Sequence, residues 1–258
     1  MESKVLNSSQ LMDLILHCLG RKEPLSVVSF GASETFVLAQ YNLLSEEEFM
    51  NHAEAKRANR GERRGHGHRG VRFPNIKARD KALEALLLAD VIGYNMMVRD
   101  EHSGLLTEKV LEYYGLNPPY IFEAYLRRVI MFSQWEKFQE MLRGKKIIII
   151  CGYADEVKAS MGYRLQKTLG FEIVGTLKIF EFEEIPRLIE ELNNYTFDLC
   201  LLAAGINAII LGSHISRDLG KVAFDLGLGM ETLVTGKPHL KDLLYMIGPR
   251  GVKKLMKM

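Results

Sequence analysis

A carboxylate beside a glycine turn is the first feature of the sequence that could do chemistry. Residues 31–34 read Gly-Ala-Ser-Glu, directly after the apolar run Leu-Ser-Val-Val-Ser-Phe and before a helix-like segment. Divalent metals prefer hard carboxylate oxygens, so Glu34 could bind such a metal, with Gly31 and Ser33 beside the ligand. Metal-dependent chemistry usually employs a pair of acids, however, and this turn has one. The turn is therefore an active site, the remnant of one, or a structural turn.

Two further turns follow apolar runs in the same way, at residues 151–156 and 203–208. Each can leave backbone N–H groups free near the start of a helix, where a phosphate would be stabilised. Gly205, Ile206 and Asn207 are candidates for diphosphate contacts of this kind, and Lys221 could add a positive charge. None of the turns matches the dinucleotide fingerprint or the P-loop, so a purely structural role is the alternative for each.

A basic, glycine-rich segment occupies residues 56–72. Its arginines, which could bind the phosphates of a ligand, are Arg57, Arg60, Arg63, Arg64, Arg69 and Arg72. We assign Arg72, and Asn75 in the turn that follows, to the same ligand site. RNA binding is an alternative, but no aromatic residues are interleaved for base stacking, so a solvated loop is favoured over nucleic acid. His66 and His68 lack a third metal ligand and are a weak metal signal.

The bulk composition is that of an ordinary globular protein. The 258 residues are 47% hydrophobic and 26% charged, and a net charge of +2 gives no global reason to expect a polyanionic partner. Cys18, Cys151 and Cys200 are far apart in apolar contexts, which indicates small core residues in a reducing compartment. We find no signal-peptide stretch and no apolar run of the ~20 residues that a membrane span needs. We therefore expect a soluble, cytoplasmic protein.

Apolar, β-branched runs alternate with segments of helical periodicity. Strands are predicted at residues 24–30, 89–94, 145–152, 171–179, 197–205 and 221–227, and helices at 8–20, 45–57, 76–88, 106–115, 156–170, 182–194 and 207–220. Two more helical pieces are expected within residues 120–144. This alternation predicts βαβ units and an α/β fold, with a Rossmann-like, mostly parallel sheet flanked by helices. In such sheets ligands collect at the carboxyl ends of the strands, where the three turns would lie.

We expect one domain over residues 1–258. Within it, residues 25–140 form an N-terminal part that carries the basic loop 56–72, and residues 144–230 form a Rossmann-like C-terminal part. The continuous apolar run Lys-Lys-Ile-Ile-Ile-Ile-Cys-Gly at 145–152 is typical of a strand buried on both faces of a parallel sheet.

Four blocks of the sequence, in this order, resemble the bacterial glycosyltransferases of the GT-D fold. They are LSVVSFGASETFVLAQYNLLS, FPNIKARDKALEALLLADVIG, RGKKIIIICG and FDLCLLAAGINAIILGSHISRDLGKVAFDLG. The resemblance covers most of residues 25–230. In that family the first block contains a D-x-E motif, whose carboxylates hold a divalent metal under a nucleotide-sugar diphosphate.

The match at this motif is partial. Gly31 and Glu34 agree with the family, whereas Ser29 stands in place of an arginine, Ala32 in place of the first acid and Ser33 in place of a glycine. Alanine cannot ligate a metal, and loss of the arginine removes a positive charge. A Gly-His pair expected after the last strand is also changed, because Leu228 follows Gly227. Of Arg127 and Arg128, which match a region where the family keeps an arginine, one is expected to face the site.

The resemblance implies transfer of a hexose from a nucleotide diphosphate sugar, with UDP the expected nucleotide, to a glycan or glycoprotein acceptor at the cell surface. Glu34 would contact a Mn or Mg ion or the donor sugar. The acid that activates the acceptor is one of Asp80, Asp155 and Asp225. A catalytically lapsed relative that binds a nucleotide-sugar or a partner transferase is the alternative, and local capping is the alternative role of Asp225. The aromatic residues of segment 113–135 would pack in the core, and would also suit a homodimer interface.

Overall fold

The computed structural model describes residues 3–60, 70–98, 104–238 and 240–258. Its centre is an 8-stranded sheet with the strand order β1-β4-β3-β2-β8-β7-β5-β6. The strands are β1 (Lys4–Leu6), β2 (Leu25–Phe30), β3 (Val91–Tyr94), β4 (Tyr120–Glu123), β5 (Lys146–Cys151), β6 (Glu172–Leu177), β7 (Leu199–Ala203) and β8 (Val222–Asp225). All of their pairings are parallel, so the predicted α/β fold with a parallel, Rossmann-like sheet is confirmed.

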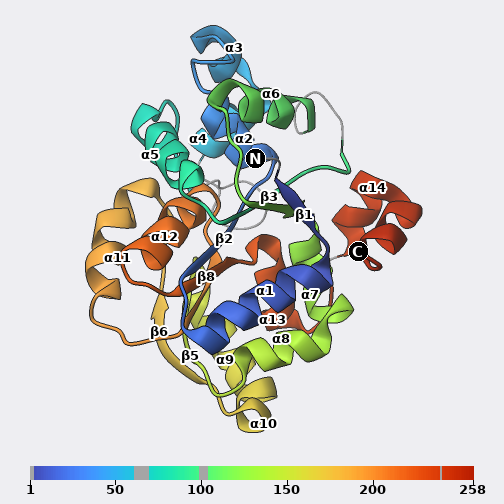
Figure 1. Cartoon of the computed structure of the whole chain (residues 1–258). Helices are drawn as coiled ribbons and strands as arrows, with labels where there is room; N and C mark the ends of the chain where they lie inside the picture. The colour runs from blue at the N-terminus through green and yellow to red at the C-terminus, as the bar shows by residue number, and fades with distance from the viewer. Residues whose placement is uncertain (1–2, 61–69, 99–103, 239) are drawn as a thin grey trace.

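The order of the strands divides the sheet into two halves. Strands β1 to β4 form one half and β5 to β8 the other, and the halves meet where β2 pairs with β8 through Leu25–Val222, Ser26–Ala223 and Val27–Phe224. Because every strand is parallel, all the connections cross over, and the segments that follow the strands emerge at one edge of the sheet. Figure 1 shows these connections as helices around the sheet.

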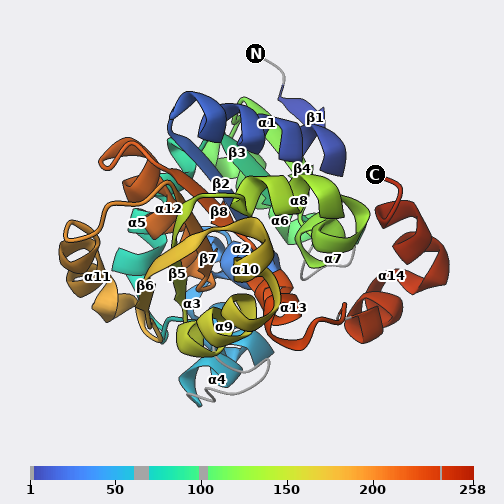
Figure 2. The ribbon, with the colours of Figure 1, turned by 90° about the horizontal axis from the view of Figure 1, so that it is seen from below.

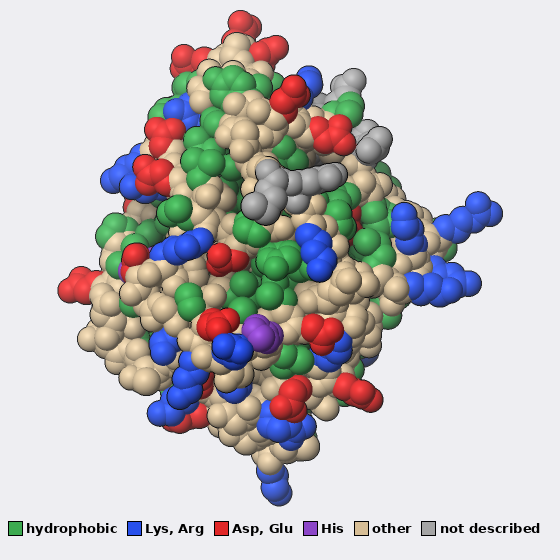
Figure 3. Space-filling model, viewed as in Figure 1, with side chains coloured by type: hydrophobic (Ala, Val, Ile, Leu, Met, Phe, Trp, Pro, Cys, Tyr) green, Lys and Arg blue, Asp and Glu red, His purple; other side chains and the backbone are tan. Residues whose placement is uncertain are grey.

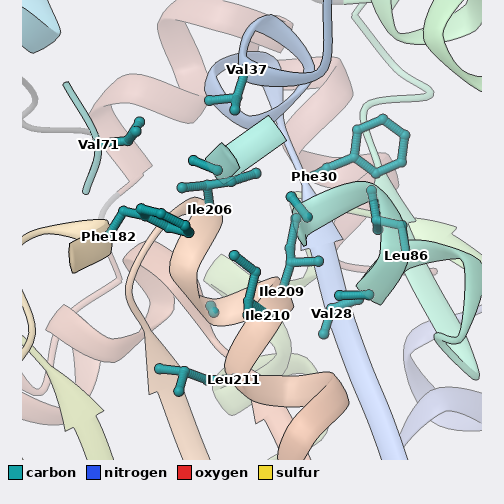
Figure 4. Packing of buried hydrophobic residues seen from close by; sticks show 14 of the residues in the cluster. Val28, Phe30, Val37, Val71, Leu86, Phe182, Ile206, Ile209, Ile210 and Leu211 are labelled. Atoms are coloured by element: carbon teal, nitrogen blue, oxygen red, sulfur yellow. The ribbon is translucent and has the colours of Figure 1, made fainter. Parts of the chain in front are cut away.

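One face of the sheet is covered by α2 (Ala32–Ala39), α5 (Ile76–Leu87), α6 (Gly104–Tyr114), α11 (Ile185–Leu192) and α12 (Ile206–Arg217). The short helices α3 (Glu46–Asn51) and α4 (Ala53–Asn59) add Phe49, Ala55 and Ala58 to the same core. Figure 4 shows how Ile206 and Ile209 of α12 pack between Phe182 and the strand residues Val28 and Phe30. This continuous apolar packing holds the start of α12 against the end of β2.

The other face is covered by α1 (Ser8–Arg21), α7 (Leu126–Ser133), α8 (Trp135–Leu142), α9 (Ala154–Met161), α10 (Lys167–Leu169), α13 (Met230–Thr235) and α14 (Leu240–Leu255). Neighbouring residues of one strand enter opposite cores: Ile147 and Ile149 face this side, whereas Ile148 and Ile150 face the other. Burial on both faces explains why β5 is a continuous apolar run. Figure 2 shows α1, α8 and α9 on this side, with α14 at the edge of the molecule.

Local structure departs from the sequence-based expectations in a few places. Strands β1 and β4 were not predicted, and β4 lies in a segment assigned to helix; both are only three or four residues long and owe their conformation to pairing with each other and with β3. The helix expected at 156–170 contains a π-helical turn at Gly162–Gln166 between α9 and α10. The helix expected at 45–57 is interrupted at His52. No helix among the described residues is long and apolar enough to cross a membrane.

Candidate active site

A cleft of about 1200 Å³ lies at the carboxyl edge of the sheet. Its walls come from the segments that follow β2, β3, β4, β5, β7 and β8, together with α13 and the first half of α14. The turns at 31–34 and 203–207, which the sequence separates by about 170 residues, therefore line one cavity. The expectation that these turns meet at the strand ends is fulfilled because the sheet is parallel throughout.

Glu34 lies in the first turn of α2 and lines this cleft beside Gly31 and Ser33. One of its carboxylate oxygens, Oε2, accepts a hydrogen bond from the backbone N–H of Gly31 at 2.9 Å. This contact satisfies one of the free N–H groups at the start of the helix, so Glu34 also acts as a helix cap. The other oxygen, Oε1, is the part of the carboxylate left to contact a ligand.

Asp225 ends β8 and forms an ion pair with Arg127 at the base of the cleft. Its side chain is buried, and Oδ1 accepts a hydrogen bond from the backbone N–H of Gly227 at 2.9 Å. The net pKa of Asp225 is raised to about 6: burial raises it most, Arg127 opposes this rise, and the nearby Glu34 adds a smaller rise. The cleft thus contains a carboxyl group that changes its protonation close to neutral pH.

Gly227 makes room for this ion pair. Its φ of 49° lies in the left-handed region, and a Cβ at this position would come within 2.7 Å of Nη1 of Arg127. Only a residue without a side chain fits both the backbone conformation and the approach of the guanidinium. The turn after β8 therefore sets the position of Arg127 over Asp225.

Arg128, the neighbour of Arg127 on α7, lines the same cleft. Its guanidinium lies over the ring of Tyr125, with 5.2 Å from Cζ to the ring centroid. Nη1 is buried and has no hydrogen-bond partner among the described residues. Burial, and to a smaller extent Arg127, lower the pKa of Arg128. A buried guanidinium nitrogen with an unused donor is costly, and an anionic ligand would remove that cost.

The turn after β7 contributes Gly205 and Asn207 to the cleft. Gly205 has a φ of 56° and precedes α12 as its N-cap residue. Asn207 donates from Nδ2 to the carbonyl oxygen of Gly70 at 2.9 Å, whereas its Oδ1 is buried without a partner among the described residues. Ile206 points into the hydrophobic core (Figure 4), so only its backbone is available to a ligand.

Other predicted site residues lie elsewhere. Lys221 precedes β8 and is therefore at the amino edge of the sheet, opposite the cleft. Asp80 pairs with Arg79 at 2.7 Å on α5, and Asp155 pairs with Lys178 at 2.6 Å. None of these three side chains is among the residues that line the cleft. Of the three candidate bases, the structure brings Asp225 alone to the cavity.

Residues 70–75 are also engaged in structural contacts. Arg72 pairs with Glu181 at 3.4 Å, and Asn75 is the N-cap of α5, where Oδ1 accepts from the N–H of Ala78 at 2.9 Å. Arg57 lines the cleft and pairs with Glu54 at 3.2 Å. The remaining part of the basic segment, with Arg63, Arg64, His66, His68 and Arg69, lies outside the described residues.

Glu123 supports the site without lining the cleft, and it was not among the predicted residues. It ends β4 and is fully buried, and its two oxygens accept backbone N–H hydrogen bonds from Met96, Met97 and Tyr125 at 2.8 to 3.1 Å. Burial raises the pKa of Glu123, an effect that these hydrogen bonds oppose. The carboxylate thereby fixes the loop after β3 and the start of α7, from which Arg127 and Arg128 extend. An acid at the end of a strand was the available signal, but β4 itself was not predicted.

The acids near the cleft do not form a metal site by themselves. Glu34 caps its own helix, Asp225 pairs with Arg127, and the side chain of Ala32, two residues before Glu34, has no oxygen that could ligate a metal. No group of three or more His, Cys, Asp or Glu side chains that could hold a metal ion occurs in the part of the chain that the structure describes. The acids present thus do not fit a site in which two free carboxylates hold a divalent metal.

The fold agrees with a comparison against protein families. The family of GT-D fold-like domains matches residues 6–233, and the chain belongs to this family. The match covers strands β2 to β8 in full and the last residue of β1. It also covers the cleft residues from Gly31 to Glu231. It ends before α14. No curated protein sequence matches the chain.

Proposed function

We propose that the protein is a glycosyltransferase that moves a hexose from a nucleotide diphosphate sugar, with UDP as the nucleotide, to a glycan or glycoprotein acceptor. The family relationship supports a glycosyltransferase-related fold. The observation that carries the proposal is the presence, in one cleft, of an arginine whose Nη1 has no hydrogen-bond partner in the part of the chain that the structure describes and of a carboxyl group with a pKa of about 6. The arginine can donate a hydrogen bond to a diphosphate, and the carboxyl group can accept the proton of an acceptor hydroxyl.

In the proposed reaction the bond between the anomeric carbon and the diphosphate oxygen breaks, and a bond to the acceptor oxygen forms. Negative charge develops on the departing diphosphate, and Arg128 would stabilise it through the unused Nη1 donor. The backbone N–H groups at the turn of Gly205 and the start of α12 would contact the same phosphates. Oε1 of Glu34 would accept a hydrogen bond from a sugar hydroxyl.

Asp225 would accept the proton of the acceptor hydroxyl. A general base works best when its pKa lies near the operating pH, and burial brings Asp225 to about 6. The transfer rate should therefore rise with pH through about 6. Replacing Asp225 by Asn should lower the rate by about 10²-fold or more, since the amide cannot take up the proton.

The proposal is tested by hydrolysis of UDP-glucose, in which water takes the place of the acceptor. The protein is incubated with UDP-glucose, and the release of UDP is measured with and without added manganese. UDP release that disappears in Asp225→Asn and Arg128→Gln would support it. Release that is unchanged in both variants would contradict the roles assigned to these residues. A strict manganese requirement would contradict the proposal that protein cations alone stabilise the departing diphosphate.

A second candidate function is a non-catalytic relative that binds a nucleotide-sugar or a partner transferase. The observation that favours it is the altered motif, in which Ala32 and Ser33 replace an acid and a glycine. Such a protein would bind UDP-glucose without releasing UDP. The same assay, combined with a binding measurement, separates the two functions.

A further inference from the structure

The C-terminal helix α14 differs in charge from the rest of the chain. Residues 240–258 contain one acid, Asp242, and five basic residues, which are Lys241, Arg250, Lys253, Lys254 and Lys257. The segment alone therefore has a net charge of +4, whereas the whole chain has +2. It lies beyond residues 6–233, so the family relationship does not account for it.

The inner side of α14 is anchored to the body of the protein. Leu243 and Leu255 are fully buried in the core that also contains α1 and α7. The hydroxyl of Tyr125 donates to Sδ of Met246 at 3.6 Å, and the carbonyl of Met258 accepts from the N–H of Ser8 at 2.8 Å. The helix is kinked at Gly248, just before Pro249, and contacts on both sides of the kink hold it in place. Its outer side is thus presented in a fixed orientation.

The outer side combines cations with large apolar side chains. Tyr245 is 93% exposed, and Leu244 and Met256 are also exposed. Arg250, Lys253, Lys254 and Lys257 line one shallow hollow with Met258. No acid among the described residues forms an ion pair with any of these four cations. Figure 3 shows blue side chains projecting at the edge where Figure 1 places α14.

We propose that α14 binds the surface of an anionic lipid bilayer. A helix that lies in a membrane interface needs apolar and aromatic side chains to enter the acyl boundary and Lys or Arg to meet the headgroups, and the outer side of α14 offers both. A nucleic acid would explain the cations but would leave the exposed Leu244 and Met256 without a role. The charge complementarity and the apolar exposure together favour lipid.

This contact would also set the orientation of the cleft. Asp242, Tyr245 and Met246, in the first half of α14, line the cleft, while the four cations lie in the second half. A bilayer that meets α14 therefore lies beside the mouth of the cleft. The binding itself does not depend on the proposed sugar transfer, so each can fail without the other.

The test is co-sedimentation of the full chain with vesicles of phosphatidylcholine alone, or of phosphatidylcholine mixed with phosphatidylglycerol. We expect binding to the mixed vesicles only, and weaker binding at high salt because surface electrostatics are screened. The variant Lys253→Gln/Lys254→Gln/Lys257→Gln should bind at least about tenfold more weakly. The matched control, Lys109→Gln/Lys158→Gln/Lys167→Gln, removes the same charge from exposed positions on α6, α9 and α10 and should bind like the wild type.

A second variant, Leu244→Ser, tests the apolar contribution, and its binding should also fall while the charge stays the same. Thermal unfolding of each variant verifies that the fold is retained. The inference is overturned if the wild type does not bind anionic vesicles, if both triple variants bind equally well, or if the protein prefers duplex DNA or single-stranded RNA to the vesicles. UDP-glucose binding by the α14 triple variant should match the wild type, which keeps this result separate from the proposed function.

Discussion

The side chain of Arg128 provides the clearest indication of a ligand site. Its guanidinium is packed on Tyr125, and Nη1 is buried with no partner among the described residues. We predict that Arg128→Gln weakens UDP-glucose binding by about tenfold or more, since a charge-assisted hydrogen bond to phosphate contributes roughly 1.5–3 kcal/mol. Isothermal titration measures the change. Arg21→Gln, which removes an exposed arginine at the end of α1, is the control and should leave binding unchanged.

Asp225 gives the folded protein a distinct dependence on pH. Because its pKa is about 6 in the fold and roughly 3.9 in an unfolded chain, the folded state binds this proton more tightly. Protonation of Asp225 therefore contributes fully to the free energy of unfolding below about pH 4, and this contribution is lost as the pH rises toward 6.

Urea unfolding of the wild type and of Asp225→Asn, at several pH values between 4 and 7, measures this effect. The free energy of unfolding of the wild type, relative to the variant, should fall across this range by up to about 3 kcal/mol. Two parallel curves would mean that Asp225 has an ordinary pKa in the fold. The proposed role as a base near neutral pH would then lose its basis.

At the scale of elements, the turn after β8 positions the ion pair between Arg127 and Asp225. Gly227→Ala should destabilise the protein by about 1–3 kcal/mol and displace Arg127, because the new Cβ would lie 2.7 Å from Nη1. Gly220→Ala is a matched control: its φ of 65° imposes the same backbone strain, but a Cβ there meets nothing within 4 Å. Equal losses of stability in the two variants would show that the strain of the turn, and not Arg127, is what requires glycine.

The same scale shows which parts of the site the sequence could predict. The turns at 31–34 and 203–207 were identifiable because each follows a buried apolar run, and a parallel sheet brings such turns together. Lys221 was assigned to the same site, but a residue that precedes a strand lies at the opposite edge from one that follows it. Arg127 and Arg128 were named only through the family resemblance, which did not say which of them faces the site, and both line the cleft. Glu123 was missed because it ends β4, whose four residues have too short a pattern to separate strand from helix.

At the scale of the whole molecule, the regular βαβ alternation of residues 145–227 predicted the fold class, because buried parallel strands are continuous apolar runs. The sequence did not predict that β2 lies between β3 and β8 in the sheet; the structure shows this order. The place of α14 was not predicted either, since the Gly248-Pro249 break interrupts its helical periodicity. The homodimer that the aromatic segment 113–135 suggested stays a prediction: Phe122 and Tyr125 are buried, whereas Tyr113 and Trp135 are exposed.

The central claim, that the cleft binds a nucleotide diphosphate sugar through protein cations, is tested most directly by thermal unfolding during a titration with UDP-glucose, with and without manganese. A ligand that binds only the folded state raises the melting temperature, by roughly 5 °C or more at a hundredfold excess over Kd for a chain of this size. We predict such a rise without metal, and its loss in Arg128→Gln. No rise with UDP-glucose or with other nucleoside diphosphate sugars, in the presence or absence of manganese, would contradict the account.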